Sequence, residues 1–135
     1  SNYLFFIDSD IILREDTIFK LIKDNKDIIS GVYVDVCGSI VAVDKWINNS
    51  YKLLTIIDMC KQIRETNNNV IETKGAGCGC LLIKKDIFYK ISKPYFKFGK
   101  TIGEDLMFCN KVMKAGYKIY LDTSITVNHI KMVIY

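Results

Sequence analysis

The feature that most constrains the fold is a run of five apolar residues near the start of the chain, Tyr3–Ile7 (YLFFI). Aromatic and β-branched side chains of this kind are enriched in strands. A strand that is apolar on both faces is typical of the centre of a sheet that other elements cover. Asp8, Ser9 and Asp10 follow directly. The segment therefore predicts a central strand that ends in two carboxylates.

Helical and strand patterns alternate irregularly along the rest of the chain. We expect helices over residues 16–25, from about 53 to the asparagines at 67–69, and over 86–91 and 103–115, with Gly116 ending the last one. Expected strands cover residues 28–35, 39–43, 70–73, 80–83, 118–121 and 125–128, and residues 46–51 are predicted to form a loop. This order predicts an α/β fold with a mixed sheet, in a single domain over residues 1–135.

Composition narrows the class of protein. The chain is 50% hydrophobic and 25% charged, which is typical of globular domains and excludes a disordered chain. The net charge is +4 with Lys and Arg spread along the sequence, which disfavours nucleic acid as a partner. Five cysteines without C-x-x-C spacing predict reduced, mostly buried thiols in a cytosolic protein, with metal binding or redox chemistry as the alternatives. The start at Ser1 rather than Met predicts a trimmed chain.

Asp8 and Asp10 are candidate metal ligands. Residues i and i+2 of an extended segment point to the same side, so both carboxylates can face one ligand. Carboxylate oxygens suit hard divalent cations, and ligands of α/β sheets bind beyond strand ends. A D-x-D pattern is common by chance, so its place after an apolar strand carries the argument.

Three further features are candidates, each with a structural explanation of its own. Glu104 and Asp105 open a helix, where carboxylates stabilise the terminus or serve as a general base. His129, the only histidine, follows a strand and is either a hydrogen-bonded imidazole or a metal ligand. The glycine segment, residues 75–79 (GAGCG), allows close approach of its backbone to a ligand or makes a tight turn.

The order of these features resembles the family 2 glycosyltransferases and their GT-A relatives. The stretches that carry the resemblance are residues 3–10 (YLFFIDSD), 75–91 (GAGCGCLLIKKDIFYKI) and 103–129 (GEDLMFCNKVMKAGYKIYLDTSITVNH). The resemblance implies a three-layer α/β/α fold of the GT-A type with a mixed sheet. Residues 44–69 match nothing in that family.

Several roles follow from the resemblance, position by position. Asp10 and Asp8 would hold Mn²⁺ or Mg²⁺ against the donor's diphosphate, with His129 as a further ligand. Asp105 matches the catalytic base, and Glu104 would orient the acceptor. Gly75, Ala76 and Gly77 would line the sugar pocket, with Asp8 beside the donor. Tyr95 and Phe96 would either stack on a sugar ring or lie in the core.

The resemblance also implies the partners. The donor is a nucleotide-sugar, with a UDP-sugar as first candidate, and the acceptor is a glycan, a lipid-linked sugar or a protein. Family 2 members invert the anomeric centre, whereas the D-x-D plus His set also occurs in retaining relatives, so both outcomes stay open with inversion as the first expectation. The portion that would hold the nucleoside, upstream of D-x-D, is expected to be missing, which predicts a fold truncated on its N-terminal side and a chain inactive by itself. An exposed sheet edge at Tyr3–Ile7 predicts a homodimer. We expect a cytoplasmic protein, at or near the cytoplasmic face of a membrane.

Three other hypotheses stay open on sequence grounds. The first is a non-catalytic nucleotide- or carbohydrate-binding domain of the same fold, which would make no use of Asp105. The second is a nucleotidyltransferase, although that class normally has a basic, Gly-rich loop near its N-terminus. The third is a structural module with thiols in its core.

Overall fold

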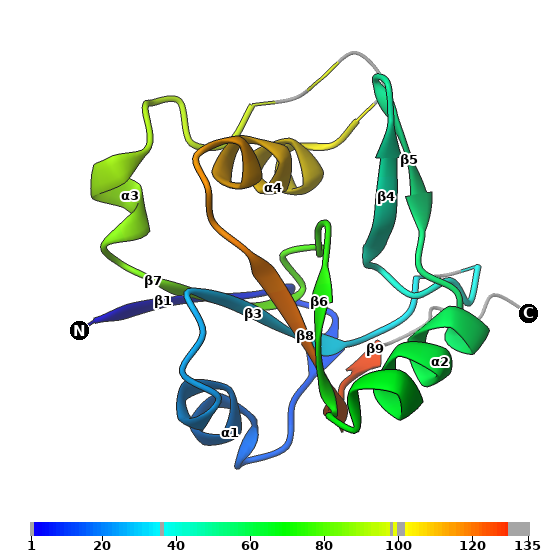
Figure 1. Cartoon of the computed structure of the whole chain (residues 1–135). Helices are drawn as coiled ribbons and strands as arrows, with labels where there is room; N and C mark the ends of the chain where they lie inside the picture. The colour runs from blue at the N-terminus through cyan, green and yellow to red at the C-terminus, as the bar shows by residue number, and fades with distance from the viewer. Residues whose placement is uncertain (1, 36, 98, 100–101, 130–135) are drawn as a thin grey trace, which may run out of the picture.

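A mixed five-stranded sheet forms the centre of the molecule (Figure 1). The computed structural model describes residues 2–35, 37–97, 99 and 102–129, with His129 described by its backbone alone. Strand order is β1-β7-β3-β8-β6. The bounds are Tyr3–Ile7 for β1, Cys80–Lys84 for β7, Ile28–Val32 for β3, Ile119–Thr126 for β8 and Val70–Thr73 for β6. β3 and β8 run parallel, and the other neighbours are antiparallel, so the predicted mixed α/β class is confirmed.

β1 lies at the edge of this sheet, so the prediction of a central strand was wrong. Within the described residues it pairs only with β7. Leu4 and Ile7 on β1 are 43% and 47% exposed. An apolar run of this length predicts burial on both faces, but it does not specify how many strands lie beside it. The exposed edge that was expected at these residues is confirmed.

Helices cover both faces of the sheet (Figure 1). Because side chains alternate along a strand, Ile28 and Leu81 face one side while Ile29 and Leu82 face the other. On the first side pack α3 (Ile87–Lys90) and α4 (Glu104–Lys114). On the second side packs α1 (Thr17–Lys23) through its fully buried Leu21. The first cluster, through Phe108, Cys109 and Val112, fixes α4 over the sheet.

A hairpin stands where a loop was predicted. β4 (Val43–Ile47) and β5 (Ser50–Leu53) pair with Trp46 opposite Tyr51. The Asn-Asn-Ser sequence suggested a loop, but Asn48 adopts φ 53°, which a tight hairpin turn requires and asparagine tolerates. The next helix, α2 (Ile56–Thr66), begins later than expected, after Leu53 has ended β5. It ends at Asn67 as expected, with φ 50°.

The C-terminal strands also differ from the prediction. Residues 118–121 and 125–128 were expected as two strands, but β8 is continuous over Ile119–Thr126. Gly31 pairs with Asp122 and Val32 with Thr126, so the residues between them bulge out of the ladder, which explains the polar break in the sequence. A short pair, β2 (Ile11–Ile12) with β9 (Asn128–His129), follows. Within the described part of the chain, no helix combines the length and apolarity needed to cross a bilayer.

Candidate functional site

The register of β1 on β7 brings Asp8 to the glycine segment. Ile7 lies opposite Cys80. The next step of the ladder is the backbone amide of Asp8, which donates to the carbonyl of Gly79 at 3.2 Å. Asp8 is exposed there, directly beyond the strand. One predicted ligand therefore lies beside the segment predicted to line the pocket, although about 70 residues separate them in sequence.

α4 approaches the same segment from the other side. Asp105 and Cys109 are four residues apart, so they share one face of the helix. The Cys109 thiol donates to the Ala76 carbonyl at 3.2 Å and accepts from the Ala76 amide at 3.4 Å. A Cβ added at Gly77 would lie 3.3 Å from Asp105 Oδ2. Cys109 therefore fixes α4 against the glycine segment, with the Asp105 carboxylate at Gly77.

The side chain of Tyr33 also contacts the glycine segment. Its phenol accepts a hydrogen bond from the Gly79 amide at 2.9 Å, and the side chain is 6% exposed. A Cβ at Gly79 would come within 2.5 Å of Tyr33 Cζ, and one at Gly77 would collide with the phenol oxygen. The glycines are required here because Tyr33 occupies the space of a side chain. No sequence pattern predicts this contact, because its two residues are 46 positions apart.

The charges of Asp8 and Asp105 act on the same two buried groups, Tyr33 and Cys78. Burial raises the pKa of Tyr33; the Gly79 hydrogen bond opposes this, while the charges of Asp8 and Asp105 add to it. Burial likewise raises the pKa of the Cys78 thiol, and the charges of Asp105, Asp8 and Glu104 raise it further. Both groups stay neutral at physiological pH, so the negative charge of this region belongs to the carboxylates.

The carboxylate of Asp105 is held in place by its own helix. Its Oδ1 accepts a hydrogen bond from the Leu106 amide at 2.8 Å, which leaves Oδ2 on the side of Gly77. Glu104 is exposed at the first position of α4. A fixed carboxylate oxygen at a helix start can accept a proton from a bound hydroxyl.

The predicted metal ligands are brought together only in part. Asp8 and Asp10 are both exposed after β1, and Ile11, next to Asp10, pairs with His129 across β2 and β9. The backbone of His129 is therefore close to that of Asp10, while its side chain lies outside the described residues. Within the residues that the structure describes, no group of three or more metal-binding side chains is formed. Two carboxylates beside a strand end remain a donor set suited to Mn²⁺ or Mg²⁺.

The other predicted pocket residues are largely internal. Gly75, Ala76 and Gly77 are buried, and they pair with residues 41–43 through backbone hydrogen bonds. Phe96 stacks on Phe108 with a centroid distance of 4.7 Å, so its ring belongs to the core. Their contact with a sugar stays a prediction.

All five cysteines are free, as predicted, but the prediction that most of them are buried was wrong. Cys37 and Cys60 are exposed, while Cys80 and Cys109 are buried. Burial raises the pKa of Cys109 to about 12, against the hydrogen bond with Ala76. The buried thiols are therefore packing groups and weak hydrogen-bond donors rather than nucleophiles.

Comparisons with known proteins bear on the fold and leave the predicted GT-A type untested. No protein-family model and no curated protein matches the chain. Among solved structures it is similar to A197 from STIV, with a TM-score of 0.63 and 20% sequence identity. The match covers 97% of this chain and 59% of that chain. At this identity the similarity shows a shared fold alone.

Proposed function

We propose that this chain is the metal- and acceptor-side part of a GT-A glycosyltransferase, which moves a sugar from a nucleotide-sugar to an acceptor hydroxyl. The observation that carries the proposal is the convergence of Asp8 and Asp105 on the glycine segment. Asp8 hydrogen-bonds Gly79 through its backbone, and Asp105 Oδ2 lies at Gly77. Two carboxylates from opposite ends of the chain at one strand end support a site for chemistry rather than a chance pattern.

The residues suit an inverting displacement. The acceptor oxygen attacks the anomeric carbon while the bond from that carbon to the nucleoside diphosphate breaks, and the diphosphate leaves with the electron pair. Asp105 takes the proton of the attacking hydroxyl through Oδ2, since Oδ1 is held by the Leu106 amide. Glu104, exposed beside it, orients the acceptor by a hydrogen bond.

Asp8, Asp10 and His129 are the residues that would hold Mn²⁺ or Mg²⁺ in this proposal. The backbone pairing of Ile11 with His129 supports their proximity. When bound, such a cation neutralises, as a Lewis acid, charge on the departing diphosphate. A UDP-sugar is the first donor to try.

Two linked measurements test the proposal. The first is titration calorimetry of Mn²⁺ in the presence of UDP, on this chain and on Asp10→Asn and His129→Ala. Binding should weaken in both variants, because each removes a ligand. The second is sugar transfer by the full-length gene product, with Asp105→Asn. Loss of the base should lower kcat by about 10²–10⁴-fold.

Asp86→Asn is the matched control for both measurements. Asp86 is an exposed carboxylate before α3 whose side chain caps nothing. Its variant should bind metal and turn over as the wild type does. Transfer that survives in Asp105→Asn would remove the proposed base, and metal binding indifferent to Asp10 and His129 would remove the proposed metal site.

A second candidate is a non-catalytic carbohydrate-binding domain of the same fold. It is favoured by the burial of Gly75, Ala76 and Gly77, and by cavities on the far side of α4 that do not include Asp105. Asp105→Asn separates the two functions, because a binding domain would lose nothing with this variant.

A further inference from the structure

A cavity of about 430 Å³ lies between the tip of the β4–β5 hairpin and α4, away from the glycine segment. Its volume is in the range of small-molecule sites. Its lining is amide-rich and includes one aromatic ring: Trp46, Asn48, Asn49 and Asn110 contribute to it. Amide groups both donate and accept hydrogen bonds, and an indole face packs against apolar C–H groups. This combination suits a sugar ring, which offers hydroxyls at its rim and C–H bonds on its faces.

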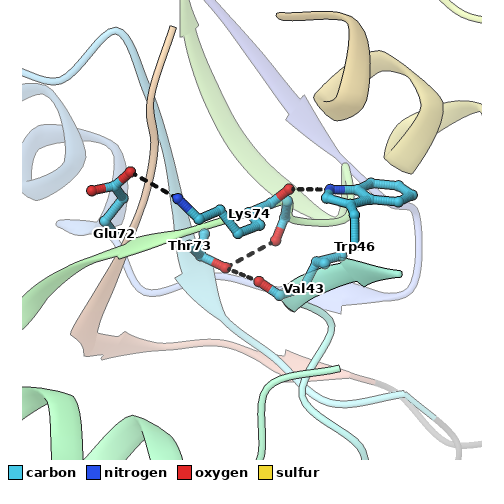
Figure 2. A network of polar contacts seen from close by, with 6 residues as sticks. Val43, Trp46, Glu72, Thr73 and Lys74 are labelled. Carbon is cyan, nitrogen blue, oxygen red and sulfur yellow. Dashed lines mark hydrogen bonds and ion pairs between the residues drawn. The ribbon is translucent and has the colours of Figure 1, made fainter. Parts of the chain in front are cut away.

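The ring of Trp46 is held in a fixed orientation. Its Nε1–H donates to the carbonyl of Lys74 at 3.0 Å, as Figure 2 shows, and its edge meets the ring of Tyr51 at a centroid distance of 5.7 Å. Thr73, the residue before Lys74 and the last of β6, donates from its hydroxyl to the carbonyl of Val43, the first residue of β4. This hydrogen bond ties β4 to β6. The indole is therefore positioned before any ligand binds, which lowers the entropy cost of binding.

A second cavity, of about 390 Å³, lies along the neighbouring part of α4 and is basic. Lys93, Lys97, Lys111 and Lys114 line it. Lys111 is engaged by the carbonyls of Ser92 and Pro94. The other three lysines form no ion pair with any residue that the structure describes. Their charges are therefore available to an anion.

The two cavities adjoin each other along one face of α4. Met107, Asn110 and Lys114 line both of them. These residues are three, four and seven positions apart, so they share a helix face, and it is not the face that carries Cys109 and Asp105. Among the described lining residues of both cavities there is no Asp or Glu. We call the combined surface the α4 groove.

We propose that the α4 groove binds an anionic glycan, with a sugar ring on Trp46 and its acidic substituents on Lys97 and Lys114. A single-stranded nucleic acid, the other class of anionic polymer with stacking groups, fits less well. Its phosphates recur at every nucleotide, so the whole groove would be basic. Here the Trp46 end carries amides and no lysine other than Lys114. The inference does not depend on sugar transfer or on Asp105.

Trp46 is the only tryptophan of the chain, so its fluorescence reports binding in the groove directly. The probes are a heparin hexasaccharide, neutral maltohexaose and a dodecameric oligothymidylate. We expect the heparin hexasaccharide to change Trp46 emission and bind tightest, with affinity that falls as salt rises. Lys114→Gln and Lys97→Gln should each weaken binding about fivefold, and Asn110→Ala should weaken it as well.

Lys90→Gln is the matched control, because Lys90 is exposed on α3 and lines neither cavity. Trp46→Ala should abolish the preference for a sugar chain over oligothymidylate, as measured by calorimetry. If Trp46→Ala disturbs the hairpin, Lys114→Gln, Lys97→Gln and Asn110→Ala still test the groove. Absence of binding to the hexasaccharide overturns the proposal, as does equal weakening by Lys90→Gln. Tighter binding of oligothymidylate would assign the groove to nucleic acid, and equal binding of maltohexaose would show that the charges play no part.

Discussion

The backbone amide of Gly79 donates a hydrogen bond of 2.9 Å to the phenol oxygen of Tyr33. The carbonyl of the same residue accepts from the amide of Asp8. Gly79 is thereby held between Tyr33, which directly follows β3, and Asp8, which directly follows β1. The position of Asp8 therefore depends on Tyr33 through Gly79. Tyr33 is thus a positioning residue for the candidate site.

Tyr33→Phe should destabilise the protein by about 1–3 kcal/mol, because the buried Gly79 amide loses its acceptor. Urea unfolding followed by circular dichroism measures the change. Tyr89→Phe is the control, since Tyr89 is 74% exposed and its hydroxyl is in solvent. Equal stability of the two variants would contradict the role assigned to the phenol.

Gly77→Ala should cost about 1–3 kcal/mol through overpacking. The new Cβ would lie 2.6 Å from Val41 Cγ1 and would collide with the phenol oxygen of Tyr33. Combined with Tyr33→Phe, the cost should be less than the sum of the two, because removal of the hydroxyl relieves part of the clash. Gly38→Ala is the comparison: apart from its two chain neighbours, no atom of the described residues lies within 4 Å of its Cβ, so its φ of 82° is what opposes the substitution. Strict additivity of Gly77→Ala and Tyr33→Phe would contradict the contact.

A pair of carboxyls at the end of α1 makes the stability of the protein depend on pH. Asp122 is 4% exposed, and its Oδ1 accepts hydrogen bonds from the amide and the hydroxyl of Ser124. Asp24 Oδ2 is buried and meets no nitrogen or hydroxyl donor among the described residues. Burial raises the pKa of Asp24 to about 7, together with a side-chain hydrogen bond to Asp122 and the charge of Asp122. The charge of Lys26 acts in the opposite direction. The protonated form of Asp24 is therefore favoured, since it can share its proton with Asp122 while the charged form cannot.

The raised pKa gives a definite sign. Between the ordinary value of 3.8 and about 7, the folded state holds a proton that the unfolded state has released, so stability falls as pH rises through this window. Asp24→Asn should remove this part of the slope and be more stable than the wild type above the window. Urea midpoints across the window measure it, with Asp86→Asn as the control that keeps the wild-type profile. An unchanged slope in Asp24→Asn would disprove the shared proton.

The exposed edge of β1 predicts association of this polypeptide. Leu4 and Ile7 leave apolar surface on an edge strand, which favours pairing with a second copy. Sedimentation velocity should show a dimer that forms as concentration rises, and Leu4→Lys with Ile7→Lys should abolish it. Phe19→Lys is the control, because Phe19 is 74% exposed on α1, away from the edge. A wild-type protein that stays monomeric at the highest concentration would contradict the prediction.

Local patterns predicted those elements whose signals lie within the element itself. α4 begins after Gly103 and ends before Gly116, whose φ of 97° only glycine adopts readily, and both signals are in the sequence. β6 lies at its predicted residues for the same reason. The β4–β5 hairpin was missed because Asn48 and Asn49 suit a loop and a tight turn equally.

The relations between distant elements could not be predicted in this way. The edge position of β1 depends on which strands pair with it, and a single apolar run does not encode that. Tyr33 and Gly79 are hydrogen-bonded although 46 positions separate them in sequence. Cys109 and Ala76 are hydrogen-bonded across 33 positions. Sequence reasoning found the carboxylates at this site because their order resembles a known family, and it missed the side chains that position them.

A hydrogen bond of Trp46 anchors the β4–β5 hairpin, and the turn at Asn48 and Asn49 lies beyond it. Trp46 is bound to the carbonyl of Lys74, while Asn48 and Asn49 project beyond this contact at the turn. Insertions or substitutions at the turn would therefore alter what the neighbouring cavity accepts without disturbing the segment that holds Asp8 and Asp105. During evolution, this division would allow the turn to diverge while the packing around the glycine segment stays constant.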